Sequence, residues 1–154
     1  MPSFFFDSSA LVKCYVDEPG SQWVRQILAP AAGNDIHVLQ IAGVEISSAI
    51  VRRRKGGSVS VADAVAALTE AEKDFASAYI VLDSVDQLLD SARRLVIAHE
   101  LRALDGIQLA AAVEVHRVRT SSGLPAITVV SADLELNAAA KREGFLVENP
   151  NDHP

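Results

Sequence analysis

Short apolar runs alternate with helix-like stretches from one end of this 154-residue chain to the other. The apolar runs have the length and composition of strands buried on both faces, and they occupy 3–6, 35–40, 79–83, 126–131 and 145–149. Apolar periodicity, capping signals and Gly or Pro breakers predict helices at 9–16, 21–29, 41–55, about 61–78, about 84–99, 105–118 and 132–143. Strands separated by helices pair in parallel. We therefore expect an α/β fold with a central parallel sheet of about five strands and helices on both faces.

The composition is that of a single folded domain spanning 1–154. Hydrophobic residues make up 49% of the chain and charged residues 22%, which argues against disorder. No apolar run approaches the roughly 20 residues of a membrane-spanning helix, and the N-terminus lacks the pattern of a signal peptide, so we expect a cytoplasmic protein with no membrane partner. Cys14 is the only cysteine, which excludes an internal disulfide and a thiolate metal cluster.

The net charge of −6 argues against nonspecific binding of nucleic acid over the whole surface. It leaves room for a local basic patch. Carboxylates that gather in a metal site also count toward the negative total, although bound cations would neutralise them.

Three aspartates stand where a predicted helix begins. Asp7 follows the phenylalanines of the first strand, Asp133 follows the fourth strand, and Asp105 opens the helix of 105–118. Each has a structural interpretation as a cap or first-turn acid, and Asp105 with Gln108 resembles a capping box. In open parallel sheets, however, ligands bind beyond the carboxyl ends of the strands near a topological switch point. The positions of Asp7 and Asp133 after strands therefore also suit an active site.

Glu45 is the fourth acid of interest. Its neighbours three and four residues away in the helix of 41–55 include no basic side chain, so an intrahelical ion pair does not explain it. A solvated position at the edge of the apolar stripe is the alternative interpretation.

A cluster of carboxylates without neutralising bases repels itself and raises its own pKa values. A hard divalent cation resolves that conflict, because Mg²⁺ and Mn²⁺ prefer oxygen ligands and bind phosphates. We therefore expect Mg²⁺, replaceable by Mn²⁺, to be the cofactor. Cations held in this way lower the pKa of a bound water and polarise a phosphoryl group during in-line attack.

Four segments, in this order, resemble the PIN-domain ribonucleases and specifically the VapC-like toxins of type II toxin–antitoxin modules. They are FFFDSSALVK (4–13), AGVEISSAI (42–50), LRALDGIQLAAA (101–112) and VVSADLELNAAAKREGFLVENP (129–150). The resemblance covers nearly the whole chain. It implies a PIN-like, Rossmann-like domain and a metal-dependent endoribonuclease. The catalytic and metal-binding quartet that it implies is Asp7, Glu45, Asp105 and Asp133.

The resemblance has further implications. Ser8 and Ser131 match supporting hydroxyl positions of the family. The substrate would be RNA, cut to leave a 5′-phosphate and a 3′-hydroxyl. The partner would be a small VapB-like antitoxin whose C-terminal segment crosses the active-site groove.

Two positions depart from the family pattern. Many relatives have alanine and histidine where this chain has Gly106 and Gln108. A glycine loosens the first helical turn, and a glutamine cannot titrate as a histidine would. These changes put a histidine-assisted step in doubt but leave the acidic quartet intact.

The basic run Arg52, Arg53, Arg54 and Lys55 ends a predicted helix. Cations suit the negative end of a helix dipole, and the functional alternative is contact with RNA phosphates. The apolar run VADAVAALTEAEKDFASAYIV (61–81) offers more apolar surface than one helix needs to pack on its own sheet. We therefore expect a homodimer that uses helices between Ser21 and Ala78.

Other function classes fit less well. A haloacid-dehalogenase-like phosphotransferase needs a second aspartate where this chain has Ser9, and a response-regulator receiver needs an acidic pair near the first strand and a lysine after the fifth. Asp83 could imitate the phosphorylation site of a receiver. A structure-specific DNA nuclease and a catalytically silent PIN-like scaffold remain as alternatives to the ribonuclease.

Overall fold

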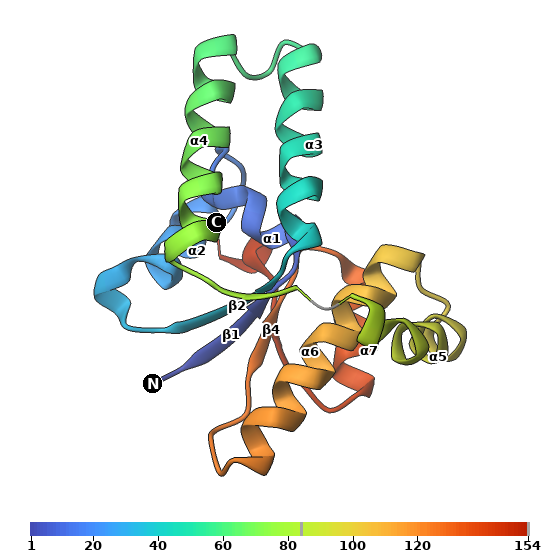
Figure 1. Ribbon diagram of the computed structural model, residues 1–154. Coiled ribbons are helices and arrows are strands. Elements are labelled where there is room, and N and C mark those ends of the chain that lie inside the picture. Colours follow the sequence, from blue (N-terminus) through green and yellow to red (C-terminus); the bar gives the residue numbers. More distant parts are fainter. Residues whose placement is uncertain (84, 154) are drawn as a thin grey trace.

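The computed structural model describes residues 1–83 and 85–153, and its centre is one sheet of five parallel strands (Figure 1). The strands are β1 (Ser3–Phe6), β2 (Asp35–Leu39), β3 (Ile80–Leu82), β4 (Thr128–Val130) and β5 (Leu146–Glu148). Each lies within a run that the sequence predicts. The α/β fold class with a parallel sheet of five strands is therefore confirmed.

Helices connect the strands, in the alternation that the sequence predicts. They are α1 (Ser8–Leu11), α2 (Ser21–Leu28), α3 (Ile41–Lys55), α4 (Val61–Ser77), α5 (Leu89–His99), α6 (Ala103–Ser121) and α7 (Leu134–Arg142). Short 3₁₀ turns are η1 (Val12–Cys14), η2 (Pro30–Ala32), η3 (Asp86–Leu88) and η4 (Pro150–Asp152). The predicted start of α5 at Ser84 lies outside the described residues.

Three helix predictions differ from the structure. Within the helix predicted at about 84–99, residues 86–88 form η3 and α5 begins at Leu89. The helix predicted at 9–16 is divided into α1 and η1. The helix predicted from Asp105 begins earlier, because Arg102 is extended and serves as the N-cap of α6. Asp105 therefore lies inside the first helical turn. In the described ranges, no helix is long and apolar enough to cross a bilayer.

The side chains of β1 alternate between two hydrophobic cores, as the pleat of a strand requires. Phe5 packs with Leu109 and Leu136 in the core beneath α5, α6 and α7. Phe6 packs with Leu11 and Ile46 in the core beneath α1, α3 and α4. Helices therefore cover both faces of the sheet (Figure 1), which is the expected arrangement for parallel strands.

The strand order β3-β2-β1-β4-β5 places a switch point beside β1. The chain builds outward from β1 to β3, then returns to add β4 and β5 on the other side of β1. The amide of Asp7 donates to the carbonyl of Val130 at 3.1 Å, which joins β1 to β4 at their carboxyl ends. The segments that follow β1 and β4 thus begin side by side, where ligands bind in such sheets.

Packing against α5 explains why a glycine stands at position 106, and the sequence alone does not reveal this. A Cβ added at Gly106 would lie 2.3 Å from Cγ2 of Val96 and 3.2 Å from the carbonyl oxygen of Ala92, both on α5. The glycine therefore allows α5 to approach the first turn of α6 closely.

We predict that Gly106→Ala lowers the free energy of unfolding by about 1–3 kcal/mol, because the added methyl group overpacks the α5–α6 contact. Gly43→Ala in α3 is the matched control, since the three atoms nearest its Cβ would all belong to the Phe75 ring and the closest would lie at 3.5 Å, an ordinary van der Waals distance. That control should gain up to about 1 kcal/mol from helix propensity. Urea denaturation of both variants measures the difference, and equal effects would contradict the packing argument.

Candidate active site

All four predicted acids line one pocket at the carboxyl end of the sheet. We call this pocket of about 340 Å³ the acidic pocket; it is lined by Asp7, Ser8, Ser9, Glu45, Arg102, Ala103, Leu104, Asp105 and Asp133. The four carboxylates come from the end of β1, from α3, from α6 and from the start of α7. Tertiary folding thus brings together residues that are up to 126 positions apart in the sequence.

Asp7 is the deepest of these acids, with 3% of its surface exposed. It is the N-cap of α1, where Oδ1 accepts hydrogen bonds from the amide of Ala10 at 3.2 Å and from the Ser9 hydroxyl at 2.9 Å. Burial raises the pKa of Asp7 from 3.8 to about 7, and these hydrogen bonds only partly oppose that rise. The capping interpretation of Asp7 is therefore correct for its geometry, but capping does not relieve the cost of ionising it.

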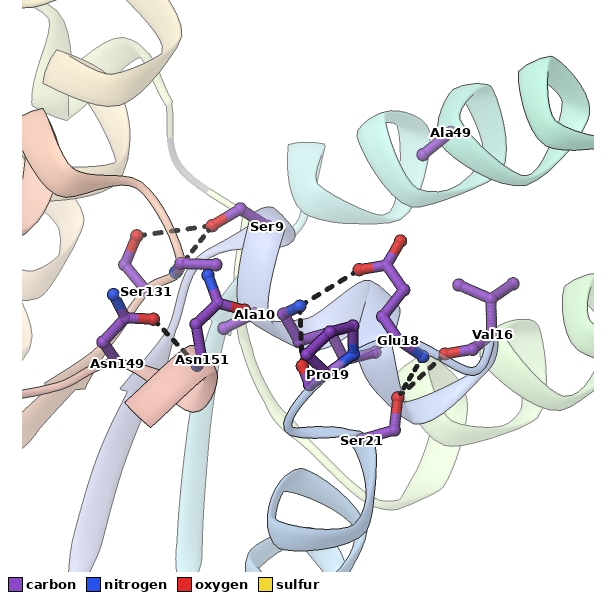
Figure 2. Close-up of polar contacts among 12 residues, drawn as sticks. Ser9, Ala10, Val16, Glu18, Pro19, Ser21, Ala49, Ser131, Asn149 and Asn151 are labelled. Atoms are coloured by element: carbon purple, nitrogen blue, oxygen red, sulfur yellow. Dashed lines mark hydrogen bonds and ion pairs between the residues drawn. The ribbon is translucent and has the colours of Figure 1, made fainter. Parts of the chain in front are cut away.

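Ser9 connects the start of α1 to the segment after β4 (Figure 2). Its hydroxyl lies 3.3 Å from the Ser131 hydroxyl and accepts a hydrogen bond from the amide of Ala132 at 3.0 Å. Ser131 in turn accepts from the amide of Asp133 at 3.0 Å. The family resemblance implies supporting roles for Ser8 and Ser131 but not for Ser9. The signal was present in the hydroxyl pair that follows Asp7.

Hydrogen bonds from two other elements orient the Glu45 carboxylate in the acidic pocket. Oε2 accepts from the Ser8 hydroxyl at 3.0 Å, and Oε1 accepts from Nε2 of Gln108 at 2.9 Å. The predicted capping box of Asp105 with Gln108 is wrong for this reason, because Gln108 is turned toward Glu45 and 1% exposed. Gln108 instead orients a carboxylate, a role that needs a hydrogen-bond donor but no titration.

Arg102 joins the remaining two acids at the mouth of the pocket. Its Nε donates to Oδ2 of Asp105 at 3.0 Å, and its Nη2 donates to Oδ2 of Asp133 at 2.9 Å. Asp133 is also the N-cap of α7, with Oδ1 accepting from the amide of Leu136 at 2.9 Å. Burial raises the pKa of Asp105, and the hydrogen bond from Arg102 only partly offsets this. From the sequence, Arg102 was one of several scattered arginines that could be solvated or contact phosphate; pairing with the acids was not predicted, although Arg102 stands three residues before Asp105.

The donor set of the acidic pocket fits a hard divalent cation in its chemistry, because it consists of carboxylate and hydroxyl oxygens. The buried carboxyl group of Asp7 and the partly buried one of Asp105, whose pKa values are raised, also favour an added positive charge. In this conformation, nevertheless, no three His, Cys, Asp or Glu side chains within 1–83 and 85–153 are placed to hold one metal ion. Arg102 occupies the oxygens of two of the acids. Metal binding would therefore require Asp105 and Asp133 to exchange this partner.

The predicted basic run divides between two environments. Arg52 and Arg53 line a second pocket that adjoins the acidic pocket, whereas Arg54 and Lys55 line neither of these two pockets. Only part of the run is therefore positioned near the candidate site.

The fold is found in several solved structures. VapC20 from Mycobacterium tuberculosis, a toxin that cleaves the sarcin-ricin loop, matches with a TM-score of 0.63 and 16% identity over 98% of this chain and 99% of that chain. FitAcB from Neisseria gonorrhoeae matches with a TM-score of 0.57 and 18% identity over 96% and 97%. VapBC2 from Rickettsia felis, bound to a DNA fragment from its promoter, matches with a TM-score of 0.56 and 14% identity over 96% and 98%.

The fold is thus that of the VapC-like PIN-domain toxins, as the sequence resemblance predicts. The sequence matches no protein-family model and no curated protein. At these identities the structural likeness concerns the fold, and the chemistry must be argued from the acidic pocket itself.

We predict that Asp7 makes the metal-free protein less stable as the pH rises from about 4 to about 7. Its pKa is 3.8 ordinarily and about 7 in the fold, so the folded state binds more protons than the unfolded state in this window, and the free energy of unfolding falls as pH rises. The loss reaches roughly 4 kcal/mol above pH 7.

Asp7→Asn should remove this pH dependence and keep the cap, because Asn caps helices equally well. Urea denaturation in chelator, at several pH values between 4 and 8, compares the two proteins. Other titrating groups contribute similarly to both, so parallel pH profiles for wild type and variant would contradict the prediction.

Proposed function

We propose that this protein is a metal-dependent endoribonuclease and the toxin of a type II toxin–antitoxin pair. The observation that carries the proposal is the convergence of Asp7, Glu45, Asp105 and Asp133 on one pocket at the switch point of the sheet. The fold that surrounds the pocket is that of VapC20, a toxin that cleaves the sarcin-ricin loop. This combination favours nuclease activity over a catalytically silent scaffold, because a scaffold has no need to bury a carboxyl group whose pKa is raised.

The quartet would hold Mg²⁺ or Mn²⁺ in the acidic pocket. When bound, such a cation supplies positive charge that polarises the scissile phosphodiester and helps ionise the attacking water. Asp7 is fixed at the floor of the pocket by Ser9 and Ala10. Glu45 is fixed at a wall by hydrogen bonds from Ser8 and Gln108.

Asp105 and Asp133 differ from the other two acids, because Oδ2 of each pairs with the same exposed arginine. The Arg102 side chain is 73% exposed, whereas Asp105 and Asp133 are 16% and 20% exposed. An exposed ion pair contributes little stability, so these two carboxylates can change partners at low cost. We infer that Arg102 neutralises them in the metal-free protein.

The partner that we propose is a small antitoxin. Solved structures with this fold include VapBC2 and FitAcB, and VapBC2 is bound to promoter DNA. DNA is the alternative substrate, since an acidic metal site would act on the phosphodiester bonds of RNA or of DNA. RNA is favoured by the sequence resemblance and by the VapC20 neighbour.

The first test is cleavage of RNA by variants of the quartet. Asp7→Asn and Asp105→Asn should each lower the rate at least 100-fold, because each removes a charged oxygen from a hard-cation site. Asp63→Asn is the matched control, since Asp63 lies in the first turn of α4, as Asp105 lies in the first turn of α6, but Asp63 is exposed and does not line the acidic pocket. Cleavage should stop in excess chelator and return with Mg²⁺ or Mn²⁺. Undiminished cleavage by Asp7→Asn would remove this residue from the active site.

The second test concerns Arg102 and is independent of activity. Arg102→Gln should tighten Mg²⁺ or Mn²⁺ binding about three- to tenfold, because two carboxylates no longer lose an ion pair on metal binding. Arg117→Gln is the control, because Arg117 also forms an ion pair with an acid three residues away, Glu114 on α6. Calorimetric titration of the metal-free proteins measures both affinities, and weaker binding by Arg102→Gln would show that the arginine does not compete with metal.

We also propose a homodimer that uses helices between Ser21 and Ala78. On α4, the alanines that face inward are buried, whereas Val61 and Val65 are 67% and 59% exposed. Exposed valines on a helix that pairs with α3 beyond the sheet (Figure 1) offer an apolar surface for a second copy. Light scattering at micromolar concentration should give twice the 16.4 kDa chain mass. A monomer at that concentration would contradict this proposal.

A further inference from the structure

A second pocket adjoins the acidic pocket, and its charge is different. We call this pocket of about 360 Å³ the basic pocket; it is lined by Ser8, Ser9, Val12, Lys13, Glu18, Glu45, Ala49, Arg52, Arg53 and Ala132. Three of these residues, Ser8, Ser9 and Glu45, also line the acidic pocket. The two pockets therefore share a wall, with the carboxylates mainly on one side of it and three cationic side chains on the other.

Glu18 organises two of the three cations. Its Oε2 accepts from Nζ of Lys13 at 3.1 Å, and Lys13 also donates to the carbonyl of Pro19 at 3.0 Å. The other oxygen of Glu18 pairs with Nη2 of Arg53, whose Nη1 donates to the carbonyl of Ala49 at 3.2 Å. Lys13 is 4% exposed and fixed in position. Lysine has three donors and arginine has five, so both side chains keep N–H groups that these contacts do not use.

Arg52 is the cation that remains available. Its side chain is exposed and lines the basic pocket. Among residues 1–83 and 85–153, no hydrogen bond or ion pair of its guanidinium is found. The lining of this pocket carries three cations, Lys13, Arg52 and Arg53, against two carboxylates, Glu18 and Glu45, which leaves an excess of one positive charge. An anion of the ligand can therefore bind without displacing a protein carboxylate.

A polynucleotide matches this distribution of charge. Its scissile phosphate would lie in the acidic pocket. The phosphates on the 5′ and 3′ sides of the scissile phosphate would lie beside that pocket. Resting on the proposed function, we propose that the basic pocket binds the phosphate that flanks the scissile phosphate of single-stranded RNA. Arg52 contacts this phosphate directly, and Glu18 positions Lys13 and Arg53 toward it. Phosphate contacts of this kind position a nucleic acid but do not read its sequence.

The first experiment measures cleavage of a short single-stranded RNA whose cleavage site has been mapped. Arg52→Gln should raise KM about tenfold, the usual effect of losing one charge-assisted hydrogen bond, and should leave kcat nearly unchanged. The slope of log KM against log salt concentration should also fall by about 0.7, the value for one phosphate contact on a single strand. Arg94→Gln is the control for loss of one positive charge, since Arg94 is exposed on α5 and lines neither pocket.

The second experiment assigns the contact to one phosphate. A neutral methylphosphonate replaces the linkage on the 5′ side or the 3′ side of the cleavage site. At one of these positions the neutral linkage should raise KM for wild type but should have little further effect on Arg52→Gln. Such non-additivity indicates that the arginine and that phosphate interact.

The outcomes separate this proposal from the function on which it rests. If wild type cuts no RNA, the proposed function fails and the flanking-phosphate site fails with it. If wild type cuts RNA but Arg52→Gln and Arg94→Gln have the same KM, or if both methylphosphonates act additively with Arg52→Gln, the basic pocket does not bind a flanking phosphate. Unchanged thermal melting of Arg52→Gln excludes misfolding as the cause of a raised KM.

Discussion

The structure depends on a buried carboxyl group at the end of its central strand. Asp7 follows Phe6, which is fully buried, and has only 3% of its own surface exposed. The amide of Asp7 joins β1 to β4, its side chain caps α1, and its partner Ser9 contacts the segment after β4. One residue thus fixes the geometry of the switch point, but its ionised form is poorly solvated there. The site consequently favours a bound cation or a bound proton.

Packing on the two faces of the sheet positions the other acids around Asp7. On one face, Ile46 lies in the same core as Phe6, and this anchors the turn of α3 that carries Glu45. On the other face, Gly106 permits a close approach of α5 to α6. The same helix α6 carries Gln108, whose amide reaches Glu45 from across the sheet edge. The site is therefore held by both cores, and small residues are as important to it as charged ones.

Side chains of opposite charge lie in two neighbouring pockets. The chain is acidic overall, with a net charge of −6, yet a pocket with three cations adjoins the pocket with four carboxylates. In each pocket a residue of the opposite sign pairs with two of the charged side chains: Arg102 with Asp105 and Asp133, and Glu18 with Lys13 and Arg53. Net charge alone would have argued against a polyanionic ligand. The local arrangement supports one, because a cation and a phosphate can be accommodated side by side.

The sequence by itself determined the strands, most helices and the parallel sheet, because these follow from apolar runs of strand length and from local capping chemistry. Ser60 caps α4, as its spacing to Asp63 predicts. Alternation of Phe5 and Phe6 between two buried faces is likewise a local property of a strand. The four acids could be named from their positions after strands and at helix starts, together with a family resemblance.

Only the tertiary structure decided what these acids contact. Gln108 was expected to cap α6 and instead binds Glu45, Ser9 links β1 to β4, and Arg102 pairs with two acids. Each of these contacts reaches beyond its own helix or loop, up to 123 positions along the chain. Local sequence patterns indicate which residues can cap or line a helix. They do not record which side chains from distant segments share one pocket, because that is set by how helices pack on the two faces of the sheet.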